Sequence, residues 1–363
     1  MIVKNLVLCP HIFIVRSVYL AVALTVLFSP SCTSQSAQEP TGKPIVETLR
    51  CSDPDSRDQD DMCLWIHLTE PAQSTIIASD KEANKLFIYD LEGRTIQVIP
   101  AKHPGNIDAR YDFPLGKENV DIIAFNQRDD PRILVYKVVV STRHLERVDN
   151  DAITTGENYG GTLYHSPKTG KYYFVATSES GQVEQYELSD DGKGKVQGKK
   201  VRSWKIGKCE AAVADDQTGK IYIGEENKGV WEIGGEPEDA APGKLVIKLG
   251  DNGLNGDVEG LAIYHLPEEI GYLIVSNQSR SNFKVYRREG EHIFVGTFAV
   301  EGAKETDGVD VINVNLGSRF SLGLFACHSA EGSSCPVLIT TWESVAKAFQ
   351  PELKISTEWN PRK

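Results

Sequence analysis

The chain has 363 residues and a formal net charge of −12, and 25% of its residues are charged and 40% apolar. These proportions are ordinary for a folded protein, whereas the excess of acid makes nucleic acid a poor partner. The length could hold two domains, but a repeat architecture can use all of it as one.

The first segment has the pattern of an export signal. Lys4 and Arg16 stand around apolar stretches, and residues 18–28 are too short to span a bilayer but suit a signal-peptide core. Small residues precede Cys32, as in bacterial lipoprotein signals, although Ser29 stands where an aliphatic residue is usual. We therefore predict a signal peptide over 1–32 and an exported protein: secreted, periplasmic, or an outer-surface lipoprotein held to the membrane only through an anchor at Cys32.

The next segment, 33–44, is rich in Ser, Gln, Pro and Thr and is predicted to be a flexible tether. Residues 45–350 repeat one pattern at intervals of roughly 45 to 51 residues: an apolar run, a polar hairpin and an alternating segment. The copies begin near Ile76, Val120, Tyr172, Ile221, Tyr272 and Leu322. Period-two alternation of β-branched and aromatic residues predicts antiparallel strands.

Four strands fit each interval. The sequence thus predicts an all-β fold, a six-bladed β-propeller of four-stranded antiparallel blades. Residues 45–49 and 337–342 are candidates for closing the ring, 351–363 form a C-terminal tail, and little helix is expected.

Polar and mostly acidic groups stand ahead of one apolar run in each unit. They are Asp60–Asp61, Asn106 with Asp108, Asn158–Tyr159, Glu210, Asp257 with Glu259, and Asp307 with Asp310. Equivalent positions of successive blades fall on one ring, so these groups should converge at one end of the channel. Gathered carboxylates repel each other unless a cation is present, and calcium accepts such oxygen arrays. A single acid at a strand start is usually solvated or caps a turn, but the recurrence favours a metal site.

A second polar ring is predicted in the hairpin after the following strand. It consists of Asp80–Lys81, Gln127–Arg128, Ser178–Glu179, Glu225–Glu226 and Asn277–Gln278. Lys81 and Arg128 bring the positive charge that a polyanionic substrate needs, whereas Glu225 and Glu226 extend the metal site. Taken alone, a lysine in a hairpin is usually only solubilising.

Five cysteines remain after signal removal. We favour disulfides between Cys51 and Cys63 and between Cys327 and Cys335, with Cys209 unpaired; five packed thiols are the alternative. The histidines form no His-Glu-x-x-His pair, and His67, His165 and His265 follow strand patterns, so zinc is disfavoured.

From about Asp58 to about Ala346 the chain resembles the β-propeller phytases, calcium-dependent phytate hydrolases of bacteria. The stretches that carry the resemblance are Asp60–Asp61 before Trp65, 106–115 (NIDARYDFPL), 159–160 with 163–166, 168–173 (KTGKYY), 184–188 (EQYEL), 257–261 (DVEGL) and 306–311 (TDGVDV).

The resemblance implies a monomeric 3-phytase, with several Ca²⁺ ions at the channel mouth and two phosphate sites, one for cleavage and one for affinity. It implies calcium-coordinating roles for Asp61, Glu210, Glu226, Asp257, Glu259 and Asp307, to which the acidic ring adds Asp60 and Asp108. Lys81, Arg128 and Tyr159 would hold phosphate, and Lys81, Glu210, Glu226 and Glu259 form the expected catalytic set. The implied mechanism is direct attack of a calcium-bound water on phosphorus.

The chain departs from that family pattern at several places. Glu179-Ser180 replaces a Lys-Glu step, which removes a cation from the affinity site, and 326–329 (ACHS) replaces an Asp-bearing loop in the last blade. Two alternatives follow: a related calcium-dependent phosphatase that prefers other phosphate esters, or a non-catalytic calcium-binding surface propeller. The presence of Lys81 and Glu210 favours catalysis over the latter.

Overall fold

The computed structural model describes residues 45 and 48–362. The predicted signal peptide, the tether and Cys32 lie outside the described residues. No helix of the described part is long and apolar enough to cross a membrane.

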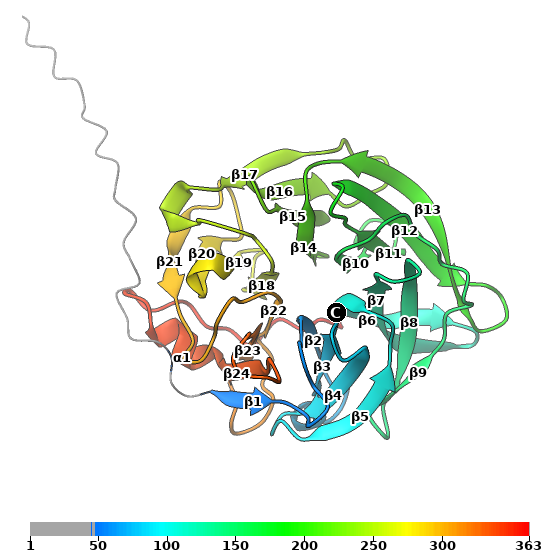
Figure 1. Cartoon of the computed structure of the whole chain (residues 1–363), viewed down its shortest axis with the longest axis horizontal. Coiled ribbons are helices and arrows are strands. Elements are labelled where there is room, and N and C mark those ends of the chain that lie inside the picture. Colours follow the sequence, from blue (N-terminus) through cyan, green and yellow to red (C-terminus); the bar gives the residue numbers. More distant parts are fainter. Residues whose placement is uncertain (1–44, 46–47, 363) are drawn as a thin grey trace, which may run out of the picture. The chain divides into compact units, whose positions relative to one another are not determined.

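Six four-stranded antiparallel sheets form the ring of a β-propeller, as predicted (Figure 1). The first blade contains β2 (Asp61–Trp65), β3 (Thr75–Asp80), β4 (Lys85–Asp90) and β5 (Thr95–Pro100). The second contains β6 (Pro104–Leu115), β7 (Glu118–Gln127), β8 (Arg132–Val139) and β9 (His144–Arg147). The third contains β10 (Gly161–His165), β11 (Tyr172–Ala176), β12 (Gln182–Asp190) and β13 (Val196–Lys205).

The fourth blade contains β14 (Cys209–Asp215), β15 (Lys220–Glu225), β16 (Gly229–Gly234) and β17 (Lys244–Lys248). The fifth contains β18 (Leu261–His265), β19 (Gly271–Asn277), β20 (Asn282–Arg287) and β21 (Phe294–Phe298). The sixth contains β22 (Val309–Ile312), β23 (Leu324–His328), β24 (Val337–Thr341) and β1 (Leu49–Cys51). Helical structure in the described residues is limited to α1 (Trp342–Lys347) and three short 3-10 turns, Pro71–Gln73, Asp251–Gly253 and Gln278–Arg280.

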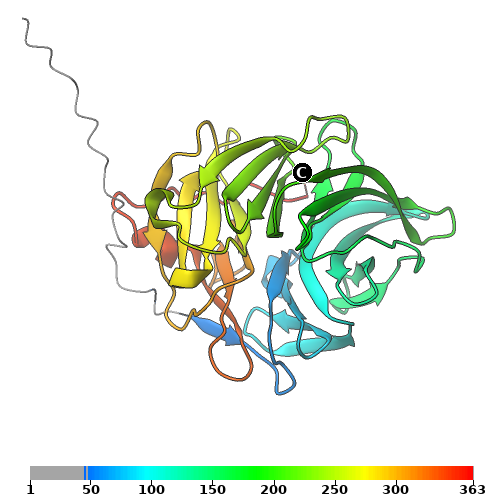
Figure 2. The ribbon, with the colours of Figure 1, turned by 45° about the horizontal axis from the view of Figure 1, so that its top comes forward.

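The ring closes through the sixth blade, whose outer strand comes from the N-terminal side of the chain. β1 pairs with β24, with Leu49 opposite Ile339 and Cys51 opposite Val337. The closing segment thus begins a few residues later than the predicted 45–49, while Ile45 bridges to Val300 in the neighbouring blade. In the tilted view β1 lies at the rim of the ring (Figure 2).

Burial of the side chains decreases from the inner strands of a blade to its outer strand. All residues of β2 and β3 are buried, because the faces of the inner strands pack against neighbouring blades. The outer strand β5 has only exposed and half-buried side chains. The core therefore consists of interfaces between blades rather than one central cluster.

Antiparallel pairing fixes where the functional side chains meet. Each inner strand begins beside the end of the second strand of its blade: Asp61 lies opposite Ser79, and Cys209 opposite Glu225. The groups before the inner strands and the hairpins after the second strands therefore share one end of the channel, which we call the mouth.

The opposite end of the channel is covered by the C-terminal segment. The Trp359 ring stacks on the His265 ring with centroids 4.2 Å apart, and Arg362 lies over the Tyr111 ring and pairs with Asp121. The chain ends near the centre of the ring in Figure 1. A cavity of about 420 Å³ lies above this segment, inside the ring.

The predicted disulfides were wrong, since all five cysteines of the described region are free thiols. Cys51 lies on β1 of the sixth blade and Cys63 on β2 of the first, so different sheets hold them. Cys327 is fully buried in β23, whereas Cys335 lies half-buried in the loop before β24. Four of these thiols serve as small core residues, as in the alternative reading.

Candidate active site

Lys81 and Arg128 lie in a network of acids at the mouth. Lys81 follows β3, and its Nζ lies 2.5 Å from Asp60 Oδ1, 3.4 Å from Asp58 Oδ2 and 3.6 Å from Asp307 Oδ2. Asp60 is buried, and burial alone would raise the pKa of its carboxyl, but Arg128 and Lys81 hold that pKa below its ordinary value. Asp60 therefore remains ionised and positions both cations.

Arg128 joins opposite sides of the mouth. Its Nη2 donates to Asp60 Oδ2 at 2.8 Å and to Glu210, while its Nε donates to the Tyr159 carbonyl at 2.9 Å. The guanidinium lies 4.5 Å from the centre of the Tyr159 ring. These contacts use Nε and Nη2 but not Nη1, so they orient the planar donor without using all of it.

Glu226, Asp257 and Glu259 form a compact carboxylate cluster. One oxygen from each lies within 4.8 Å of the others. Glu226 Oε1 and Glu259 Oε2 are buried and have no hydrogen-bond partner in the described part of the chain. Buried acceptors without donors are costly, and adjacent anions make them more so. A hard cation that takes oxygen ligands, such as calcium, fits this donor set.

Glu259 of the cluster and the nearby Glu210 have perturbed proton affinities. Burial raises the pKa of Glu259, and the nearby Glu210 raises it further. Burial also raises the pKa of Glu210, although Arg128 opposes it. The two carboxyls lie close enough to interact, so without a cation their mutual repulsion favours a proton on Glu259.

Asp61 begins β2 of the first blade, and Asp307 stands two residues before β22 of the neighbouring sixth blade. Asp61 Oδ2 accepts from the Ile107 backbone N–H at 3.0 Å. A Cβ atom at Gly308 would lie only 2.1 Å from Asp61 Oδ1, so the glycine after Asp307 lets this backbone pass close to Asp61. Burial raises the pKa of both carboxyls.

Asp108 lies deeper in the channel than the other predicted metal ligands. It pairs with Ala124 in mid-strand, whereas Pro104 lies opposite Gln127 at the mouth edge of the same blade. Asp108 Oδ1 accepts from Arg110 Nη1 at 2.9 Å, and Oδ2 accepts from Thr162 Oγ1 at 2.7 Å. With Asp310 it lines the cavity above the C-terminal segment.

The residues of the second predicted ring also differ in whether they join the acids of the mouth. Glu225 accepts from Trp231 Nε1 at 2.8 Å and pairs with Lys228, so it does not join Glu226 in the carboxylate cluster. Gln278 from the fifth blade reaches Asp307 Oδ1 at 2.5 Å.

Lys208 is a mouth residue that the sequence analysis missed. Its Nζ lies 3.1 Å from Glu226 Oε2, 3.9 Å from Glu179 Oε1 and 5.0 Å from the centre of the Tyr159 ring. It stands just before β14, outside both predicted rings, which is why periodicity did not identify it. Lys208 therefore places a positive charge beside Glu179, where the sequence predicted that the affinity site lacks a cation.

These features define a six-bladed β-propeller whose mouth combines a cluster of buried carboxylates with lysine and arginine side chains. The Phytase family model matches residues 16–363. The chain is 35% identical to a 3-phytase of Bacillus subtilis (strain 168) over 323 residues, which cover 84% of each chain. The chain therefore belongs to the phytase family, which are phosphoric monoester hydrolases.

A solved structure shows the same fold at much lower sequence similarity. The calcium-binding protein regucalcin from Agrobacterium tumefaciens matches with a TM-score of 0.51 and 12% identity, over 80% of this chain and 92% of that chain. This likeness concerns the propeller architecture alone.

Proposed function

We propose that this protein is an exported, calcium-dependent phytase that releases phosphate from myo-inositol hexakisphosphate. The observation that carries the proposal is the meeting, at one mouth, of the Glu226–Asp257–Glu259 cluster with Lys81 and Arg128. Family membership supports the substrate class, and the N-terminal sequence pattern supports export.

Six acids at the mouth would hold calcium: Asp61, Glu210, Glu226, Asp257, Glu259 and Asp307. Calcium bound there would neutralise phosphate oxygens and lower the pKa of the attacking water, so that water reacts directly with phosphorus. The buried, donor-free oxygens of Glu226 and Glu259 support this assignment.

The remaining roles belong to the chain's own side chains. The Lys81 side chain is 24% exposed while it contacts three acids, so its ammonium is available to stabilise charge on the transferring phosphoryl group. Arg128 is fixed by Asp60 and the Tyr159 carbonyl, which leave its Nη1 unused. It would orient a phosphate through Nη1. Glu210 and Glu259, whose proton affinity burial raises, would accept the proton of the attacking water.

A second candidate, a related phosphatase with weaker preference for phytate, is favoured by Glu179. An anion there repels a neighbouring phosphate of the substrate. Lys208, 3.9 Å from Glu179, offsets that repulsion and supports the phytase proposal.

Steady-state hydrolysis of phytate and of a simple phosphomonoester at fixed calcium tests the proposal. We expect kcat/KM to be higher for phytate, and we expect Lys81→Met to lower it by about 100-fold or more because a charge-stabilising donor is removed. Equal values for both substrates would support the second candidate. No phosphate release from either substrate would contradict both.

A further inference from the structure

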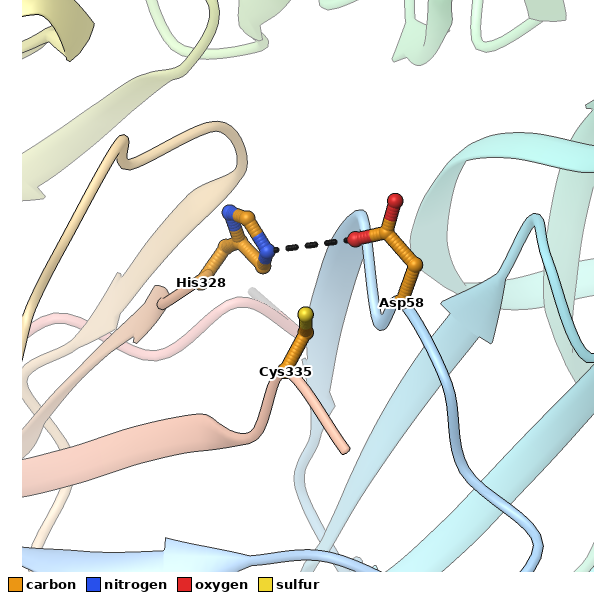
Figure 3. Close-up of side chains that lie close together, drawn as sticks. All are labelled: Asp58, His328 and Cys335. Atoms are coloured by element: carbon orange, nitrogen blue, oxygen red, sulfur yellow. Dashed lines mark ion pairs between the residues drawn. The ribbon is translucent and has the colours of Figure 1, made fainter. Parts of the chain in front are cut away.

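A second group of potential metal ligands lies beside the mouth and consists of Asp58, His328 and Cys335 (Figure 3). One ligand atom from each lies within 4.8 Å of the others. Asp58 belongs to the loop before β2 in the first blade, whereas His328 ends β23 and Cys335 lies in the loop before β24 in the last blade. The cluster therefore joins the two blades that meet where the ring closes.

The distances in this cluster suit coordination better than hydrogen bonding. His328 Nε2 lies 3.4 Å from Asp58 Oδ1, whereas charge-assisted hydrogen bonds are usually about 2.7–2.9 Å. Two ligands bound to one tetrahedral ion at about 2.0–2.1 Å are separated by about 3.3–3.4 Å. The observed separation therefore matches an edge of a zinc coordination tetrahedron.

The imidazole of His328 is already oriented for this role. Its side chain is 2% exposed, and Nε2 is buried without a hydrogen-bond partner in the described part of the chain. On the other side of the ring, Nδ1 accepts from the Asp307 backbone N–H at 3.1 Å and lies 3.3 Å from Asp307 Oδ2, so the ring is fixed with Nε2 facing Asp58. Zinc binding through Nε2 would shift the ring proton to Nδ1, where Asp307 Oδ2 lies near enough to accept it, as in histidines that bind metals.

The surrounding contacts hold the other two ligands in place. Asp80 accepts from the backbone N–H groups of Arg57 at 2.7 Å and Asp58 at 3.0 Å, which fixes the loop that carries Asp58. The Gln59 backbone N–H donates to the Cys335 carbonyl at 3.4 Å across the blade boundary. Asp58 Oδ2 faces Lys81, so Oδ1 is the oxygen left for a metal.

The ligand types select a different metal from the one that suits the mouth acids. Calcium and magnesium take oxygen ligands, whereas a set of thiolate, imidazole and carboxylate is typical of zinc. The three side chains leave a fourth position for water. The predicted exclusion of zinc depended on His67, His165 and His265, and it did not consider ligands that are about 270 residues apart in the sequence.

We propose that Asp58, His328 and Cys335 bind a zinc ion that ties the last blade to the first and stabilises the closed ring. The bound ion would connect the loop before β2 with the loop between β23 and β24, next to the point where β1 pairs with β24. This inference does not depend on phytase activity.

Cobalt titration of the metal-stripped full chain, with excess calcium present, tests the proposal. We expect one equivalent of Co²⁺ to give a thiolate-to-cobalt charge-transfer band together with visible bands of tetrahedral cobalt, and we expect Zn²⁺ to displace both. Cys335→Ser should lose the charge-transfer band. Cys209→Ser is the matched control and should keep it, because Cys209 is buried in another blade.

Thermal unfolding gives a second readout. Zinc should raise the melting temperature of the wild type and of Cys209→Ser by a few degrees, but not that of Cys335→Ser. Calcium-dependent phosphate release by all three proteins would show that they are folded. No charge-transfer band in the wild type, or the same band and melting shift in Cys335→Ser, would overturn the proposal.

Discussion

Individual side chains at the mouth are held in position by opposing charges. Asp60 anchors Lys81 and Arg128, and Arg128 in turn contacts Glu210, so each cation is shared among acids. The donor-free oxygens of Glu226 and Glu259 lie outside this neutralisation. The mouth therefore divides into a part that anchors Lys81 and Arg128 and a cluster of three carboxylates that, among the described residues, has Lys208 as its neighbouring cation.

This division gives a test with two acids of the same channel. Glu259→Gln should lower kcat/KM on phytate by about 100-fold or more, about 2.7 kcal/mol, because it removes a charge from the carboxylate cluster. Asp108→Asn should leave calcium affinity nearly unchanged, since Asp108 is paired with Arg110 deeper in the channel. Calorimetric calcium titration and steady-state kinetics of both variants measure the difference. Equal loss of calcium affinity in both variants would show that Asp108 is a calcium ligand.

The pair of Glu179 and Lys208 provides a substrate-specific test. Glu179→Lys should raise kcat/KM on phytate by roughly five- to thirty-fold, about 1 to 2 kcal/mol, with little change on a monophosphate. Lys208→Ala should lower phytate turnover, because Glu179 would then face the substrate without a neighbouring cation. The measurement is kcat/KM on both substrates at fixed calcium. Unchanged or lower phytate turnover in Glu179→Lys would show that Glu179 is a ligand or a bystander.

At the scale of the strands, buried ion pairs connect neighbouring blades. Arg288, just after β20, donates from Nε to Asp215 Oδ2 at the end of β14, at 2.6 Å, and both side chains are almost fully buried. Although burial alone would raise it, the pKa of Asp215 is lowered by Arg288. Removal of the cation would leave a buried, uncompensated carboxylate.

We therefore expect Arg288→Met to destabilise the protein by about 3–5 kcal/mol in urea unfolding at neutral pH. This loss of unfolding free energy should shrink as the pH falls below the ordinary pKa of aspartate. The reason is that a carboxyl whose pKa is lowered in the folded state stabilises the fold only above its pKa in the unfolded chain. Arg287→Met is the matched control; its partner Glu289 lies in an exposed pair, so its effect should stay below about 1 kcal/mol. Similar effects of the two substitutions would contradict this assignment.

The strand patterns explain which parts of the structure could be predicted. Recurring apolar runs and turn residues identify the blades, because each unit must bury both faces of its inner strands. The start of β1 was placed too early, since the short segments 45–49 and 49–51 both offer apolar residues for pairing with a neighbour. Periodicity also placed Asp108 at the mouth, but the irregular register of β6 carries it deeper.

Features that depend on contacts between distant residues could not be predicted from the pattern. Cysteine spacing suggested two disulfides, yet Cys51 and Cys63 lie in different sheets. Lys208 reaches Glu179 and Glu226 from a position with no equivalent in the other units. The cluster of Asp58, His328 and Cys335 forms only when the last blade meets the first.

At the scale of the whole molecule, the acids of the mouth should make stability depend on pH and calcium. Burial raises the pKa of Glu210, Glu259 and Asp307. A carboxyl with a raised folded-state pKa stabilises the fold at low pH, and this contribution is lost as the pH rises toward the folded value. We expect the calcium-free protein to melt at lower temperature at about pH 8 than at about pH 5, and calcium to remove most of the difference. A melting temperature that rises with pH in chelator would contradict the raised pKa values of these carboxyls.

The central claim is that the mouth acids hold the calcium needed for phytate hydrolysis. The most direct test is phosphate release from phytate by one preparation in calcium, then in excess chelator, then with calcium restored. We predict activity in the first state, its loss in the second and its return in the third, because the chain's own cations cannot neutralise the carboxylate cluster and the substrate together. Phosphate release that continues unchanged in chelator would contradict the claim.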